Sequence, residues 1–359
     1  MNILTLHISQ LLPGMILAED VFTPRNERIL SRNTIISPKT IAKLKFNSIK
    51  EVMVYIPKDI VQVPSSMESK TAELKNTTEF KKFKKFYMES IELLKESFMG
   101  LMGFSNSQLN TEQLLHSVSS LLKECRNSFR TFDMLQCMKE YDDIVYVHSM
   151  NVTLICASFA SWLNLSQADM QQLLLAAILH DIGKLKIPYD IIHKPTALTD
   201  QEFKTIRQHP MLGYNMVKDM DLDHRILDAI LMHHERCDGS GYPRQLTSKE
   251  ITSFPKIIAI ADVFDAMTTN RSYRNGICAF DVIQKFEEDG YQKYDVAYLI
   301  PFLKSLALAY INSTVQLSNS LVGEVVMINE QALSRPIVNV NNHFYDLSKE
   351  KDLHIVSVL

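Results

Sequence analysis

The chain has 359 residues, of which 46% are hydrophobic and 22% charged, values typical of a globular protein with room for two or three domains. Its formal net charge of -3 gives no general attraction to nucleic acid, which argues against nonspecific DNA binding. The start, MNILTLHISQ, lacks the pattern of a signal peptide, and no apolar run is long enough to span a bilayer. We therefore expect a cytoplasmic protein without a membrane span.

Residues 1–60 predict a small α+β module. Short β-rich runs lie at residues 15–17 and 52–55, and a helix-like stretch follows Ser37-Pro38. The ligand of this module is not readable from its residues, and a signalling protein is the candidate partner.

Residues 61–130 predict a linker followed by a helical connector. A polar stretch at 62–75 precedes a Lys-rich segment, Lys81–Lys95, which opens a long helix. Its apolar positions are Phe83, Phe86, Ile91 and Leu94. The connector is compatible with a homodimer contact or with packing against the next domain, and the sequence leaves both open.

Residues 131–315 have a helical pattern throughout, with loops at 193–195 and 238–243. The tail, 316–359, turns β-rich and predicts a few strands that pack on a neighbour. The five cysteines are scattered without a CxxC pair, which argues against a disulfide framework or zinc ribbon. We expect a mainly α fold with a small module before it and a β-rich extension after it.

Imidazole and carboxylate side chains continue the apolar stripes of the predicted helices in 131–315. They are His148, His180, Asp181, His209, His233, His234 and Asp262. A lone histidine on an apolar face is usually a hydrogen-bonded core residue. Several in one domain, with two carboxylates that are costly to bury unpaired, instead favour a metal site. The donor mixture suits iron, manganese or zinc, and its size exceeds one tetrahedral site, so we expect two adjacent divalent ions.

The motifs His180-Asp181-Ile182-Gly183-Lys184 and His233-His234-Glu235, with Gly241-Tyr242-Pro243 after it, resemble the HD-GYP family. The similarity covers about residues 140–310 and includes the segments 259–267 and 271–274. Residues 12–20 are similar to an N-terminal module often fused to such domains, and residues 323–326 to a small extension that follows some of them. The resemblance implies an all-helical HD-superfamily catalytic domain.

The resemblance also implies an activity. Such domains hydrolyse the 3'-5' phosphodiester of cyclic di-GMP, a bacterial second messenger, to linear pGpG, GMP or both. The centre holds iron or manganese ions, with zinc, nickel or cobalt as substitutes, and two metals supply an activated hydroxide near neutral pH.

Individual roles follow from the family's motif positions. The histidines and aspartates named above match metal ligands, and Asp181 matches the residue that bridges metals. Asp181 and Lys184 are the implied catalytic residues. The implied substrate-binding residues are Lys184, Gly241, Tyr242, Pro243, Arg271 and Arg274.

Some positions depart from the family pattern. Ile144 stands where the trinuclear subset carries a glutamate, and Asp142 and Asp143 are out of phase, so we expect two metals instead of three. Gln245 replaces a glycine, Thr252 a proline and Lys256 an arginine in and after the GYP loop. These changes keep a second interpretation open, that of a catalytically weak nucleotide sensor or scaffold. The sequence also does not define which bases are recognised, so the substrate could be another cyclic dinucleotide such as cyclic GMP-AMP.

Overall fold

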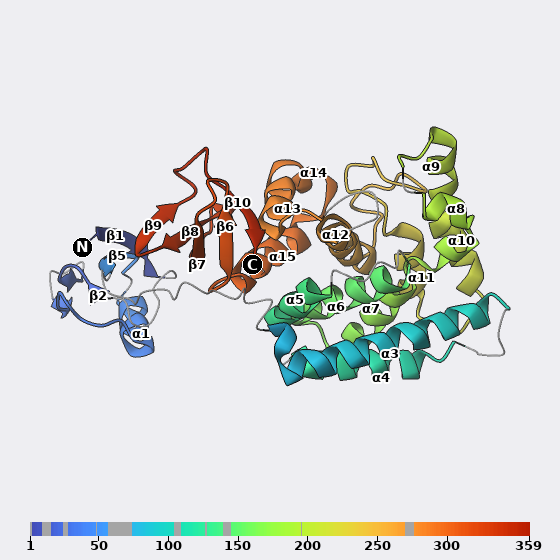
Figure 1. Cartoon of the computed structure of the whole chain (residues 1–359), viewed down its shortest axis with the longest axis horizontal. Helices are drawn as coiled ribbons and strands as arrows, with labels where there is room; N and C mark the ends of the chain where they lie inside the picture. Colours follow the sequence, from blue (N-terminus) through green and yellow to red (C-terminus); the bar gives the residue numbers. More distant parts are fainter. Residues whose placement is uncertain are drawn as a thin grey trace. The chain divides into compact units, whose positions relative to one another are not determined.

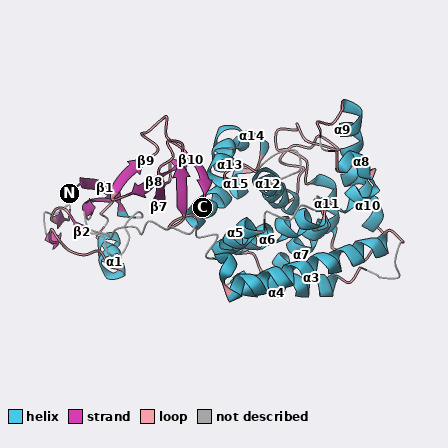
Figure 2. Cartoon of the chain, viewed as in Figure 1, coloured by secondary structure: helices cyan, strands magenta, loops and turns pink. Residues whose placement is uncertain are grey.

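The computed structural model describes residues 2–8, 16–23, 28–47, 49–56, 74–103, 109–125, 128–138, 145–194, 196–269 and 276–359. The chain divides into two compact units, one of Met1–Met67 with Ile337–Tyr345 and one of Glu68–Pro336 with Asp346–Leu359. Within the described residues, no helix is both long and apolar enough to cross a membrane. Helices dominate, which confirms the expected mainly α fold (Figure 2).

The N-terminal region is the expected mixture of strands and one helix. A sheet of order β1-β5-β2 contains β1 (Asn2–His7), β5 (Glu51–Ile56) and β2 (Ile16–Leu17), and β3 (Val21–Phe22) pairs with β4 (Arg28–Leu30). Helix α1 (Pro38–Phe46) begins after Ser37. Strand β1, which the sequence did not predict, pairs with β5 along its whole length, and this pairing is what makes it a strand.

The connector helices pack on the helical domain. They are α3 (Thr78–Leu101), α4 (Thr111–Cys125) and α5 (Ser128–Cys137), and α3 lies along α4 (Figure 1). The buried stripe of α3 passes through Tyr87, whereas the predicted Phe86 is half-buried, because the helical period from Phe83 selects Tyr87. The Tyr87 hydroxyl donates to Asn151 Oδ1 at 2.6 Å, which ties α3 to α6. A homodimer through this helix stays a prediction.

The centre of the second unit is a bundle around one almost fully buried helix, α6 (Tyr146–Trp162). Helix α7 (Gln167–Leu179) and α12 (Ser253–Thr268) pack on α6, and α11 (His224–Met232) packs on both of these. The shorter elements are η2 (Ile182–Lys186), α8 (Tyr189–Ile192), α9 (Asp200–Ile206), α10 (His209–Val217), α13 (Ala279–Lys285), η3 (Phe286–Gly290), α14 (Tyr291–Lys293) and α15 (Val296–Ala309). Because α6 is buried on every side, apolar residues lie all round it, and the polar side chains of His148 and Asn151 are buried with them.

Local signals define where these helices begin. The Ser166 side chain accepts from the backbone of Asp169 at the start of α7, and Thr199 and Glu202 form a capping box at the start of α9. The residue Pro210 follows α9 by a few positions. It lies in the first turn of a separate helix, α10, where its missing N–H costs nothing.

Gly183 brings two segments of the bundle into close contact. A Cβ atom at this position would lie 1.9 Å from the backbone oxygen of His209. Only glycine permits η2 to approach α10 so closely. This contact sets the side chains of Asp181 and His209 beside each other.

The C-terminal strands form a five-stranded sheet of order β10-β6-β7-β8-β9. They are β6 (Thr314–Leu317), β7 (Val322–Asn329), β8 (Ala332–Val340), β9 (His343–Asp346) and β10 (Ile355–Val358). The predicted β-rich runs lie in or at the edge of β7, β8 and β10, whereas β6 and β9 were not predicted.

A buried carboxylate shapes the loop after α11. Glu235 is 3% exposed, and its carboxylate accepts from the backbone of Arg244 at 2.7 Å and of Leu246 at 2.9 Å. Between these donors, Gln245 has a φ of 58°, in the left-handed region that glycine occupies without strain. Glu235 therefore holds the two sides of the loop together. It does so even though a glutamine stands where the family has glycine.

Replacing Glu235 with alanine should lower the free energy of unfolding of the helical unit by about 3 kcal/mol, because two buried backbone N–H groups lose a charged acceptor. Urea unfolding followed by circular dichroism measures this change. Glu324→Ala, at an exposed position, is the control and should shift stability by less than about 0.5 kcal/mol. Equal midpoints for the two variants would contradict the role assigned to Glu235.

Candidate metal centre

Two groups of metal-capable side chains meet inside the bundle. One contains Asp181, His209, His233 and His234, and the other contains His148, His180 and Asp262. Within each group the candidate ligand atoms lie within 4.8 Å of one another. All are buried except His234, which is half-buried. The structure thus brings together every residue that the sequence proposed as a ligand.

Most of these residues stand at helix ends. His180 ends α7, His233 ends α11, and His209 opens α10 directly after α9. The apolar stripes of these helices point to the core, so the residue that follows each stripe also faces inward. His148, in the first turn of α6, and Asp262, in the middle of α12, complete the cluster from the other side.

Asp181 lies between the two groups. Its Oδ2 atom is 3.4 Å from Nε2 of His148 and 3.4 Å from Nε2 of His180. Its Oδ1 atom is 3.2 Å from Nε2 of His209 and 3.7 Å from Nε2 of His233. Each carboxylate oxygen therefore faces a different group of imidazoles.

Main-chain carbonyls fix the tautomers of the helix-end histidines. Nδ1 of His180 donates to Ala177 at 2.7 Å, Nδ1 of His209 to Ile206 at 2.8 Å, and Nδ1 of His233 to Ile230 at 3.0 Å. A carbonyl oxygen only accepts, so each Nδ1 must carry the proton. In the neutral rings, each Nε2 then directs a lone pair into the cluster.

Some of the buried polar atoms in the cluster face no proton donor. Among the described residues, His180 Nε2 and Asp181 Oδ1 are buried without a hydrogen-bond partner. Nε2 of His209 faces Nε2 of His233 at 3.2 Å, and two lone pairs repel at that distance. Buried polar atoms of this kind are costly unless a proton or a cation lies between them.

The pKa values of His233 and His234 favour neutral imidazoles beside ionised carboxylates. Burial lowers the pKa of His233 to about 4 and that of His234 well below its usual range. Burial alone would raise the pKa of Asp181, but Lys184 and His180 hold it well below the usual range. Burial alone would also raise the pKa of the Asp262 carboxyl, but the hydrogen bond from His148 and the charges of the neighbouring histidines together hold it well below its usual range. Neutral imidazole and carboxylate are the states that bind divalent metals.

His148 differs from the other histidines because both its nitrogens face carboxylates. Nε2 lies 3.0 Å from Asp262 Oδ1, and Nδ1 lies 2.7 Å from Asp265 Oδ2. Burial alone would lower its pKa, but the hydrogen bonds to Asp262 and Asp265 raise it to about 9. The two carboxylates therefore favour a proton on each nitrogen of this ring.

The structure places part of the predicted substrate-binding set next to the cluster. Lys184 Nζ forms an ion pair with Asp181 Oδ2. The Tyr242 ring stacks on His234 with centroids 4.6 Å apart, and the Arg207 guanidinium lies 4.5 Å from the Tyr242 centroid. The Tyr242 ring is therefore packed between side chains of the domain.

The remaining predicted residues divide into two kinds. A Cβ at Gly241 would lie 2.4 Å from the backbone nitrogen of Arg236, so the loop folds back on its own backbone there, and a cis peptide joins Tyr242 to Pro243. Arg271 and Arg274, and the positions 142–144 that bear on a third metal, lie outside the described residues.

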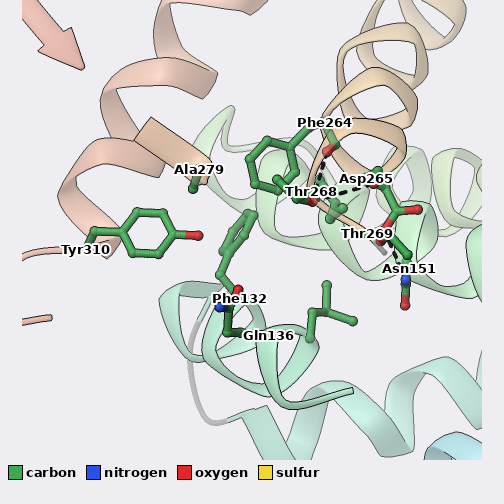
Figure 3. A pocket seen from close by; sticks show the side chains of 11 residues that line it. Phe132, Gln136, Asn151, Phe264, Asp265, Thr268, Thr269, Ala279 and Tyr310 are labelled. Atoms are coloured by element: carbon green, nitrogen blue, oxygen red, sulfur yellow. Dashed lines mark hydrogen bonds between the residues drawn. The ribbon is translucent and has the colours of Figure 1, made fainter. Parts of the chain in front are cut away.

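Sequence reasoning assigned no role to Asp265 and Asn151. Asn151 Nδ2 donates to Asp265 Oδ1 at 2.9 Å, and both side chains line a small cavity between α5, α6 and α12 (Figure 3). The one available signal was spacing, because Asp265 is three residues after Asp262 and so shares its face of α12.

Comparison with known proteins gives a family. The model of the HD domain matches residues 113–297. A cyclic di-GMP phosphodiesterase of Pseudomonas aeruginosa is 31% identical over 241 residues, which are 67% of this chain and 57% of that protein. A cyclic di-GMP phosphodiesterase of Thermotoga maritima is 35% identical over 179 residues, 49% of each chain.

A third relative has a different named substrate. The 3'3'-cGAMP-specific phosphodiesterase 1 of Vibrio cholerae is 37% identical over 138 residues, 38% of this chain and 32% of that protein. The chain thus spans about half the length, or less, of these curated relatives. From the extent of the HD match and the motifs within it, the chain belongs to the HD domain family and groups there with the HD-GYP proteins.

Proposed function

We propose that this protein is a metal-dependent cyclic di-GMP phosphodiesterase that yields linear pGpG, GMP or both. The observation that carries the proposal is the buried cluster in which Asp181 faces two groups of imidazoles, and in which the neutral rings of His180, His209 and His233 carry their proton on Nδ1 and leave Nε2 without one. Such an arrangement is stable when cations occupy it, and a pair of divalent ions is what phosphodiester hydrolysis uses.

The residues present fit two ions. His209, His233 and His234 would hold one ion, and His148, His180 and Asp262 the other, with one oxygen of Asp181 directed to each. Mixed imidazole and carboxylate donors suit iron or manganese, with zinc, nickel or cobalt as substitutes. When bound, such ions lower the pKa of water and draw charge from phosphoryl oxygens.

The chain's own residues then hold and orient the phosphodiester. Lys184 carries three N–H donors beside Asp181, so its ammonium neutralises charge on a phosphate oxygen or gives a proton to the leaving oxygen. Tyr242, held between His234 and Arg207, provides a rigid wall at the cluster. Arg271 and Arg274 are proposed to bind the second phosphate, as their motif positions imply.

Relatives with different substrates leave two candidate nucleotides. Cyclic di-GMP is preferred because the similarity to the Pseudomonas aeruginosa phosphodiesterase extends over 67% of this chain. Cyclic GMP-AMP is the second candidate because of the Vibrio cholerae relative named above. Both substrates present the same phosphodiester, so the proposed chemistry is common to them.

The direct test is anaerobic purification, a metal count, and incubation with each dinucleotide in parallel, followed by chromatography of the products. Two ions per chain and conversion of cyclic di-GMP to pGpG or GMP are expected. Bound metal with both dinucleotides intact would instead support a nucleotide sensor or scaffold. Exclusive hydrolysis of cyclic GMP-AMP would correct the substrate.

Asp181→Ala should abolish turnover and deplete bound metal, because both proposed ions lose a shared ligand. Helical content, measured by circular dichroism, should change little. The exposed Asp219→Ala variant is the control and should keep both metal and activity. A fully active Asp181→Ala enzyme would contradict the assignment of Asp181 as a ligand of both proposed ions.

Lys184→Met should lower kcat by about 100-fold while leaving the metal count unchanged, since it removes a donor to charge that develops during the reaction. Steady-state kinetics with elemental analysis measure both quantities. Lys186→Met, at an exposed position on the same short helix, is the matched control and should behave as wild type. Equal kcat values for the two variants would remove Lys184 from the proposed machinery.

Replacing both Arg271 and Arg274 with alanine should raise KM for cyclic di-GMP by at least about tenfold with normal metal content, because phosphate contacts would be lost. Initial rates over a range of substrate concentrations test this. Unchanged kinetics would mean that other residues bind the phosphates.

A further inference from the structure

The histidines of the cluster are oriented in two different ways. His180, His209 and His233 follow helix ends, where the last carbonyls have no partner within the helix and can accept from Nδ1. His148 lies in the first turn of α6, where carbonyls already serve the helix, as the bond from Ser149 N to Val145 O at 2.9 Å shows. The Nδ1 proton of His148 therefore needs a different acceptor.

Asp265 is that acceptor. It is 4% exposed, and its Oδ2 lies 2.7 Å from His148 Nδ1. Asp262 and Asp265 are three residues apart on α12, so their carboxylates face α6 together and hold the two nitrogens of His148 between them.

A short relay fixes the Asp265 carboxylate. Its Oδ1 accepts from Asn151 Nδ2 at 2.9 Å, drawn in Figure 3, and from Thr269 Oγ1 at 3.0 Å. The Tyr87 hydroxyl donates to Asn151 Oδ1, so the amide of Asn151 must present its N–H₂ to Asp265. Both carboxylate oxygens of Asp265 are thus held by hydrogen-bond donors, two of them on α6 and one a turn away in the chain.

We propose that Asp265 is a positioning residue that sets the metal affinity of the subsite formed by His148, His180 and Asp262. This inference rests on the proposed metal centre and adds to it a difference between its two subsites. A carboxylate that accepts from Nδ1–H fixes the orientation of the ring. It also makes Nε2 a stronger electron-pair donor to a metal than a neutral carbonyl acceptor would. The other group of ligands, around His209 and His233, has only carbonyl acceptors on the Nδ1 atoms of those two rings.

Asp265→Asn tests the charge while preserving the size of the side chain. Isothermal titration of the metal-free full-length protein with Mn²⁺, without oxygen, is the measurement, and it needs no turnover. Wild type should bind two ions. The variant should keep one site at wild-type affinity and weaken the other by about 10- to 100-fold.

Two further variants make the result specific. Asp295→Asn removes a part-buried carboxylate outside the cluster, whose Oδ2 lies 2.8 Å from Lys256 Nζ. This variant should leave both Mn²⁺ affinities unchanged. Thr269→Val removes one donor to Asp265 and should weaken the same subsite by a few-fold, so it tests the relay even if Asp265→Asn folds poorly.

The outcomes separate the inference from the function on which it rests. Two unchanged Mn²⁺ affinities in Asp265→Asn and Thr269→Val would overturn the role of Asp265 alone. Equal weakening of both sites, with a lowered melting temperature, would show a general structural role and also overturn it. No Mn²⁺ binding by the wild-type protein would overturn the metal-dependent function itself.

Discussion

The arrangement of this domain depends on one buried carboxylate. Asp181 has its two oxygens directed to separate groups of imidazoles, and burial of such a charge is tolerated only because Lys184 and the histidines surround it. The close approach at Gly183 brings α10 to this carboxylate, and α6, α7 and α11 contribute the remaining imidazoles. The core of the bundle is therefore organised around a charged centre.

Helix ends do most of the positioning at this centre. A helix terminus offers carbonyl oxygens that no residue of the helix can satisfy, and a histidine just beyond it can donate to them. His180, His209 and His233 use this property, which fixes each tautomer and directs each Nε2 inward. Because His148 sits at the opposite kind of terminus, it depends on Asp265, and the centre acquires two chemically different halves.

The loop beside the centre is held by a separate device. Glu235 accepts from the backbone N–H groups on either side of Gln245, which has a left-handed conformation, and Tyr242 of the same loop stacks on His234. The departure from the family pattern at this position therefore leaves the loop closed. Its remaining consequence is an exposed, long polar side chain where the family has a hydrogen atom.

The sequence by itself determined the helical class, the strands at both ends, and the set of side chains that gather at the centre. Periodicity carries this information, since a residue that continues an apolar stripe must face the core, and capping residues such as Thr199 mark helix starts. Periodicity does not predict pairing partners or turns. It therefore did not predict the strands β1, β6 and β9 or the start of a helix at His209.

Only the tertiary structure decided which polar atoms meet. Asp265 and Asn151 belong to different helices, 114 residues apart in the chain, and nothing in either local segment indicates that one serves the other. The same is true of the two oxygens of Asp181, whose separate directions depend on the packing of α10 against η2. Hydrogen bonds between distant segments are short-ranged and directional, so they are fixed by the final packing of the helices and not by the pattern along any one of them.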